Sequence, residues 1–179
     1  MEAAERATKE RILVFDEKRA DLERTCAALA HQLPFAEVEG VASLVDYHAA
    51  TQGREYDVVI IEQQLEEVSG VELMVELKLR DREPAVLLLS RSADPKVLSS
   101  IYSAGNSRCI VKEGRWLEEI GPAVRHLRRI RKLEHENAAL IAKLTEANVL
   151  WSEKNKRLDE FSGTVAHDIR GPLGGINMK

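Results

Sequence analysis

Apolar residues in the first two thirds of the chain follow two alternating patterns. Short continuous apolar runs occupy residues 11–15 (RILVF), 57–61 (DVVII) and 85–89 (AVLLL), with weaker runs at 35–39 and 109–111. Between the runs, apolar residues recur every three or four positions, which is the spacing of an amphipathic helix. Uninterrupted apolar strands are typical of parallel sheets buried on both faces. The pattern therefore predicts an α/β fold, a doubly wound, flavodoxin-like sheet of five β–α repeats.

Turn and capping residues mark the ends of the helices predicted between these strands. Pro34 ends the first helix, and a second is predicted at residues 41–50. Ser69, followed by glycine, precedes the third helix. An Asp-Pro pair, in which a capping residue is followed by proline at the first helical position, opens a fourth helix at residues 94–105.

The last third of the chain has the pattern of one long helix. A Gly-Pro pair at 121–122 either starts or kinks it, and about 50 helical residues would span roughly 75 Å. The apolar residues repeat in heptads, and a seam of this length needs a partner helix, so we expect a parallel coiled-coil homodimer. The a positions are Ile130, Asn137, Leu144, Trp151, Leu158 and Val165, and the d positions are Leu133, Leu140, Ala147, Lys154, Phe161 and Asp168.

Polar residues stand at the carboxyl ends of four of the predicted strands. They are Asp16 and Glu17 after the first strand, Glu62 after the third, Ser90 after the fourth and Lys112 after the fifth. In a doubly wound sheet these ends meet at one edge, where such folds bind their ligands. Carboxylates ligate a divalent metal, whereas a hydroxyl and a lysine bind phosphate oxygens. The sequence therefore predicts one acidic pocket that holds one ammonium and suits a metal and a phosphoryl group.

These positions resemble those of a response-regulator receiver domain over residues 11–114. The acidic pair, the hydroxyl, the lysine within IVKEG and the stretch YDVVIIEQQLEEVSGVEL all follow the pattern of that family. The resemblance implies Mg²⁺ binding by Asp16 and Glu17. It also places the phosphoacceptor aspartate on Glu62 and the aromatic switch residue on Cys109, and a glutamate replaces the proline that follows the lysine.

The glutamate at position 62 bears directly on phosphorylation. An aspartyl phosphate needs its carboxylate in line with the donor, and an error of ~1 Å can cost ~100-fold in rate. We therefore expect a pseudo-receiver that is not phosphorylated, in which Glu62 reaches Lys112 and imitates a fixed state. Mg²⁺ at Asp16 and Glu17 is then less expected than in an intact receiver. The alternative is an unused cleft lined by a salt bridge.

Residues 161–176 read FSGTVAHDIRGPLGGI and contain the second candidate site. The imidazole of His167 is a suitable nucleophile toward the γ-phosphate of ATP, and Asp168 can accept or orient its proton as a general base. The segment resembles the H-box of HisKA-type sensor histidine kinases, which implies that His167 is the phosphoacceptor on a dimerisation helix. The alternative is an ordinary interfacial histidine of a coiled coil.

Composition narrows the class of protein. The 179 residues have a net charge of −4, but residues 1–114 carry 14 basic and 21 acidic side chains, whereas residues 115–179 carry 12 and 9. Without a strongly basic domain we expect no nucleic-acid partner. No apolar run approaches the ~20 residues of a membrane helix, and the two cysteines are far apart. We therefore expect a cytoplasmic protein without a membrane segment.

These patterns predict four segments: a tail (1–10), a receiver-like domain (11–120), a signalling coiled-coil helix (121–160) and the start of a phosphoacceptor helix (161–179). No Gly-rich phosphate loop is present, so we expect a fragment of a sensor histidine kinase that binds no cofactor itself. ATP and Mg²⁺ would serve the full-length protein, and a cognate response regulator would be its partner. The alternatives are a non-enzymatic dimeric adaptor and a phosphorelay intermediate phosphorylated by another protein.

Overall fold

The computed structural model describes residues 9–80, 82–92, 95, 99, 101 and 107–173, with side chains described as far as residue 158. The helix predicted at residues 94–105 falls mostly outside this described part. The elements, in chain order, are β1 (Arg11–Phe15), α1 (Arg19–Gln32), β2 (Glu37–Val41), α2 (Leu44–Gly53), β3 (Val58–Glu62), α3 (Gly70–Lys78), β4 (Ala85–Ser90), β5 (Ser107–Val111) and α5 (Trp116–Leu173).

The strands form one parallel sheet in the order β2-β1-β3-β4-β5. Within it, Ile12 of β1 lies opposite Val38 of β2 on one side and Val58 of β3 on the other. The chain moves outward from β1 to β2 and then crosses back to β3, so the winding direction changes between β1 and β3. This confirms the flavodoxin-like, doubly wound prediction and makes the carboxyl ends of β1 and β3 the expected ligand-binding edge.

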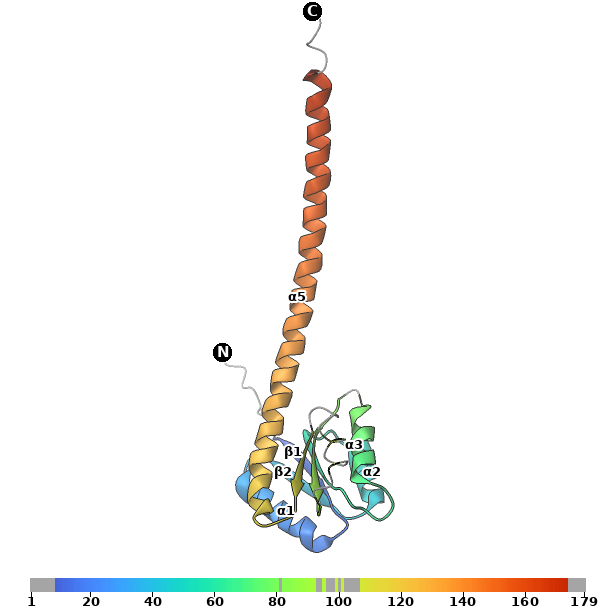
Figure 1. The fold of residues 1–179 in the computed structure, drawn as a ribbon, viewed down its shortest axis with the longest axis vertical. Coiled ribbons are helices and arrows are strands. Elements are labelled where there is room, and N and C mark those ends of the chain that lie inside the picture. The colour runs from blue at the N-terminus through green and yellow to red at the C-terminus, as the bar shows by residue number, and fades with distance from the viewer. Residues whose placement is uncertain are drawn as a thin grey trace, which may run out of the picture. The chain divides into compact units, whose positions relative to one another are not determined.

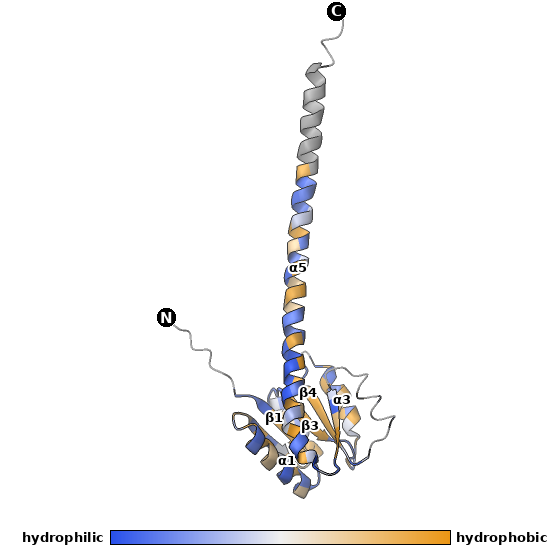
Figure 2. Cartoon of the chain, turned by 60° about the vertical axis from the view of Figure 1, so that its left-hand side comes forward, coloured by the Kyte–Doolittle hydropathy of each residue, from blue (hydrophilic) through white to orange (hydrophobic). Residues whose placement is uncertain are grey.

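Both faces of the sheet are buried because the central strands carry apolar side chains on each side (Figure 2). Figure 1 shows α1 and the beginning of α5 over one face, with α2 and α3 over the other. The first layer includes Ile12, Val14, Val58, Ile60, Leu87, Leu22, Leu29, Ile120 and Val124, and the second includes Leu13, Phe15, Val59, Ile61, Leu88, Tyr47, Leu73, Met74 and Leu77.

Two elements begin at least two residues later than the sequence pattern predicts. The strand β2 starts two residues after its predicted position, because the N–H of Ala36 donates to the carbonyl of Leu33 at 3.0 Å and keeps the chain in a turn. The helix α2 starts three residues after the predicted 41–50, because Ser43 caps it: its Oγ accepts the N–H of Asp46 at 3.1 Å. In both cases a local hydrogen bond, rather than the apolar pattern, sets the boundary.

Helix α5 begins at Trp116, so the Gly-Pro pair at 121–122 lies inside the helix and does not start it. Its first turns pack against the sheet because one side of the helix is apolar there. The buried residues on that side are Trp116, Ile120, Ala123, Val124 and Leu127. The same helix that carries the heptad pattern therefore also supplies part of the core.

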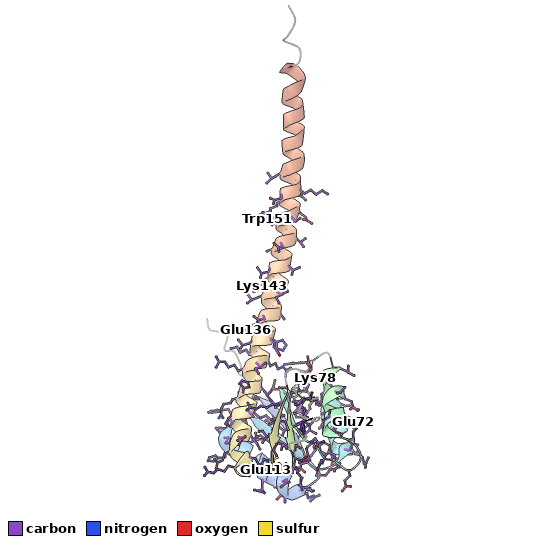
Figure 3. All side chains as sticks on the ribbon, in the orientation of Figure 1. Glu72, Lys78, Glu113, Glu136, Lys143 and Trp151 are labelled. Atoms are coloured by element: carbon purple, nitrogen blue, oxygen red, sulfur yellow. The ribbon has the colours of Figure 1, made fainter. Side chains whose placement is uncertain are left out.

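The chain divides into two compact units, Met1–Lys132 and Leu133–Lys179. In the second unit, the described side chains come from α5 alone, and its large apolar residues are exposed, among them Trp151 (Figure 3). No helix in the described part of the chain is long and apolar enough to cross a membrane. The exposed residues at predicted a and d positions are Leu133, Leu140, Leu144, Trp151 and Leu158.

Gly70, the first residue of α3, lies directly against the backbone that leaves β3. A Cβ at this position would lie 2.5 Å from the carbonyl oxygen of Glu62 and 2.9 Å from the Cα of Gln63. A capping box formed by Ser69 and Glu72 fixes the start of the helix at the same point. Only glycine allows this approach, which holds the loop after Glu62 against α3.

We expect Gly70→Ala to destabilise the fold by about 1–3 kcal/mol, because its Cβ collides with backbone that is hydrogen-bonded into the sheet. Gly53→Ala is the matched control, since a Cβ at the end of α2 meets no atom within 4 Å. That variant should be neutral or slightly more stable, because alanine is the better helix former. Urea unfolding measures both, and equal stability of the two variants would contradict the close approach at Gly70.

Candidate functional site

The ammonium of Lys112 is surrounded by three carboxylates at the carboxyl edge of the sheet. Its Nζ lies 2.6 Å from Oδ2 of Asp16 and 3.3 Å from Oδ2 of Asp21, and it forms an ion pair with Oε2 of Glu62. The side chains of Lys112, Asp16 and Glu62 are at most 5% exposed, whereas Asp21 is 19% exposed. We call these four residues the lysine cluster. Its two most buried carboxylates both depend on a single counter-charge.

The sheet topology brings the buried members of the cluster together. Asp16 follows β1, Glu62 ends β3 and Lys112 follows β5. The backbone fixes the other oxygen of each buried carboxylate: Oδ1 of Asp16 accepts the N–H of Lys18 at 2.9 Å, and Oε1 of Glu62 accepts the N–H of Gln64 at 3.2 Å. Each carboxylate is therefore held between its own loop and the lysine.

The charges of the cluster stabilise one another. Burial disfavours the charged form of Lys112, but hydrogen bonds and charges from Asp16 and Glu62 outweigh this effect and raise the pKa of the lysine. Partial burial disfavours the charged form of Asp21, but Lys112 and Arg91 outweigh it and hold the pKa of Asp21 below its ordinary value. The lysine therefore stays charged at physiological pH.

Two of the predicted pocket residues lie beside the cluster and are bonded elsewhere. Oε2 of Glu17 accepts the N–H of Glu66 at 2.8 Å, in the loop that follows β3. The hydroxyl of Ser90, buried at the end of β4, donates to the carbonyl of Ser92 at 2.8 Å. The structure thus brings Asp16, Glu62 and Lys112 into contact, whereas Glu17 bonds to the distant loop after β3 and Ser90 bonds within its own loop.

Asp21 and Trp116 also contact Lys112, although no motif in the sequence marks either residue. The ring centroid of Trp116 lies 5.5 Å from Nζ of Lys112, which is a cation–π distance. Gly114, with a φ of 56°, takes the left-handed conformation that brings the chain from β5 into α5 and places the ring there. The only sequence signals for these contacts are an acid five residues after Asp16 and an aromatic residue four positions after Lys112. Neither predicts a contact with the lysine until the fold is known.

Cys109, which stands in the place of the aromatic switch residue, lies on β5 near the cluster. It is half-buried and packs against the core layer under α2 and α3. Burial, with a smaller effect of the Glu62 charge, raises the pKa of its thiol to about 11. The thiol is therefore neutral at physiological pH and acts as a small apolar side chain rather than as a nucleophile.

The arrangement does not fit a divalent cation held by Asp16 and Glu17. The ammonium of Lys112 lies against Asp16, and the Glu17 carboxylate is bonded to the backbone of Glu66. Among the described residues, no group of three or more His, Cys, Asp or Glu side chains is arranged to hold a metal ion. The Mg²⁺ site stays a prediction that this geometry does not support.

His167 and Asp168, the residues of the second candidate site, belong to helix α5, and only their backbone is described. Their side chains fall outside those that the structure describes, so the roles of phosphoacceptor and general base stay predictions. What the structure gives is the continuity of the element: a single helix runs from Trp116 through both positions to Leu173.

Comparison with known proteins assigns the first unit. Residues 12–120, more than half of the chain, match the family model of the response regulator receiver domain. A receiver domain protein from Clostridium thermocellum is 21% identical, with a TM-score of 0.60 over 69% of this chain and 98% of that chain. No curated protein matches the sequence.

Two further solved structures share the fold. The signal receiver domain of an HD domain-containing protein from Pseudomonas fluorescens Pf-5 is 20% identical, with a TM-score of 0.63, covering 76% of this chain and 98% of that chain. A structure described as adenylate cyclase from Rhodopirellula baltica is 19% identical, with a TM-score of 0.64, covering 75% and 98%. At these identities the likeness establishes the fold alone.

We expect Lys112→Met to destabilise the protein by about 3–5 kcal/mol, because Asp16 and Glu62 would remain buried without a counter-charge. Glu62→Gln is the matched comparison: it removes one of three carboxylates around one ammonium, and we expect a loss of about 1 kcal/mol or less. Urea unfolding at pH 7 measures both variants. Similar losses would contradict a cluster centred on the lysine.

Proposed function

The chain belongs to the response regulator receiver family over residues 12–120, and we propose that this receiver signals without a phosphoryl group on residue 62. The observation that carries the proposal is the ion pair of Glu62 with Lys112, in a side chain only 3% exposed. In a phosphoryl-transfer pocket the lysine and the hydroxyl bind phosphate oxygens. Here the lysine is held by carboxylates, and the hydroxyl of Ser90 is bonded to Ser92.

The length of the glutamate side chain supports this proposal. Glutamate is one methylene longer than the aspartate expected at this position, so its carboxylate reaches farther from the end of β3. In this protein it meets the ammonium directly, and the N–H of Gln64 holds its other oxygen at 3.2 Å. Glu62 thus places a carboxylate beside Lys112 without a phosphorylation step, where a phosphorylated aspartate would bring its added charge only after one.

Helix α5 is the proposed output of this receiver. Its first turns belong to the receiver core through Ile120, Val124 and Leu127, and the helix continues to Leu173. From Leu133 onward its apolar side chains are exposed at a and d positions, which supports a two-stranded parallel coiled coil with a second copy of the chain. A change in the receiver would then alter the coil that carries His167.

We further propose that His167 accepts a phosphoryl group from ATP through the catalytic domain of a histidine kinase. Residues 161–176, which resemble a HisKA-type H-box, support this role, because they combine a histidine, a following acid and a Pro-Leu step at the end of the heptad pattern. The unprotonated ring nitrogen would attack the γ-phosphorus of ATP as ADP leaves, and the proton on the other ring nitrogen would pass toward Asp168. The receiver would then regulate a kinase rather than receive phosphate from one.

With acetyl phosphate and Mg²⁺, we expect the wild-type chain to gain no phosphoryl mass on residue 62. Glu62→Asp restores the acceptor of the family and is the positive comparison, with a rate expected to rise by about 100-fold if acceptor length is limiting. Glu67→Asp, an exposed position in the loop after β3, is the matched control. Intact-mass spectrometry follows the reaction, and labelling of wild-type Glu62 would overturn the proposal.

With the purified ATP-binding domain of a HisKA-type kinase, labelled ATP and Mg²⁺, we expect acid-labile phosphate on the chain. His167→Gln should abolish the label, whereas His135→Gln, at an exposed histidine of the same helix, should retain it. The domain's own dimerisation helix serves as the positive control. Label on that helix but not on this chain would instead favour a non-enzymatic adaptor, in which the receiver recruits a partner and His167 is inert.

A further inference from the structure

The first residue of α5, Trp116, contacts the lysine of the cluster. The Trp116 ring centroid lies 5.5 Å from Nζ of Lys112 and 5.9 Å from the guanidinium carbon of Arg24. The tryptophan is only 6% exposed and belongs to the core layer on this face of the sheet, so neighbouring side chains restrict its rotation. A displacement of the ammonium therefore acts directly on the side chain that anchors the start of the helix.

One turn later the helix has a weak point. The proline at 122 has no N–H, so the carbonyl of Glu118 loses its usual partner four residues on. The preceding Gly121 adds backbone freedom at the same place. Without reinforcement, the first turn of α5 could move while the remaining turns stayed in place, and a change at Trp116 would be absorbed at this break.

The side chain of Gln32, at the end of α1, bonds to the turn of α5 that precedes Pro122. Its Oε1 accepts the N–H of Gly121 at 3.0 Å, and its Nε2 donates to the carbonyl of Leu117 at 2.8 Å. In an undisturbed α-helix these two backbone groups would be partners of each other. The Gln32 amide therefore bonds to both ends of the turn that leads into the Gly-Pro pair and ties this turn of α5 to the end of α1.

The contact with the Gln32 side chain also explains why residue 121 is glycine. A Cβ at this position would lie 2.3 Å from Oε1 of Gln32 and 2.9 Å from its Cβ. Gly121 is therefore the residue that admits the Gln32 amide, and the Gly-Pro pair and Gln32 form one structural unit. Flexibility alone would not require a side chain from another helix to bond both ends of the turn before Pro122.

We propose that Trp116 and Gln32 transmit the state of the lysine cluster into α5: Trp116 follows Lys112, and Gln32 holds together the turn from Leu117 to Gly121 that leads into the Gly-Pro pair. The inference rests on the proposed function, in which α5 is the output of the receiver. Every contact that it uses lies within residues 16–131, so it is testable independently of the chemistry of His167. The two residues act as positioning residues and take no part in a reaction.

The contact with the cluster is tested first by fluorescence. In the Trp151→Phe chain, Trp116 is the remaining tryptophan. Adding Glu62→Gln removes one charge that holds Lys112, and we expect the emission of Trp116 to change in wavelength or intensity. Adding Glu67→Gln, which makes the same charge change at an exposed site, should leave the emission as it was. Unchanged emission with Glu62→Gln would overturn the first step of the inference.

Transmission along the helix is tested by amide hydrogen exchange at residues 123–131, beyond the break. We expect Glu62→Gln to change their exchange rates by about fivefold or more, the lower range of allosteric couplings. In a Gln32→Glu chain, which keeps the acceptor for Gly121 but loses the donor to Leu117, the effect of Glu62→Gln should fall to within about twofold. Gln52→Glu, at an exposed glutamine of α2, is the matched control and should preserve the full effect.

The outcome depends on this difference and not on stability, because each Glu62→Gln chain is compared with its own parent. An equal effect of Glu62→Gln with and without the Gln32 amide would overturn the transmission step. Trp116→Phe should reduce the effect in the same way, and Trp151→Phe should not. Should His167 fail to label while the Gln32-dependent change is present, the proposed kinase linkage fails and the coupling path stands.

Discussion

A buried ammonium shared by carboxylates from separate segments is the constraint on which this structure depends. Lys112 follows β5, its most buried partners Asp16 and Glu62 come from β1 and β3, and Asp21 comes from α1. A buried charge without its partner is far more costly than a lost surface pair, so these segments are held to one relative arrangement. The loops after β1 and β3 are fixed by the same carboxylates, because their remaining oxygens accept backbone N–H groups.

Helix α5 connects this constraint to the rest of the chain. Its first residue stacks on the lysine, its next turns fill one layer of the core, and its later turns expose apolar residues at heptad spacing. One element therefore has to satisfy the receiver core and the predicted coil at the same time. The Gly-Pro pair interrupts the helix within its core-packing turns, and the amide of Gln32 bonds to both ends of the turn before Pro122. The contact of Trp116 with Lys112 therefore connects the pocket of the receiver to this helix.

Much of the fold could be predicted from the sequence. Its central strands are buried on both faces, and their sequences are therefore uninterrupted apolar runs. The positions of Asp16, Glu62 and Lys112 at strand ends could likewise be read from the chain, since parallel strands place their carboxyl ends together. The start of α5 could not be predicted from the sequence. By local rules the Gly-Pro pair is as good a starting point as Trp116. The helix begins at Trp116 because this residue packs against the sheet.

The sequence by itself determined the periodicities: the doubly wound sheet, the long heptad helix, and the residue types available to the pocket. The tertiary structure alone decided which of those residues meet. It turned Glu17 toward the backbone of Glu66, gave Ser90 a partner in its own loop, and brought Asp21, Trp116 and Gln32 to places that no local pattern marks. The reason is physical. Neighbouring residues in the sequence together encode which side of an element is buried, and the apolar periodicity reflects this. A contact between distant segments depends on side-chain length, crossing geometry and competing hydrogen bonds, which exist only once the elements have packed.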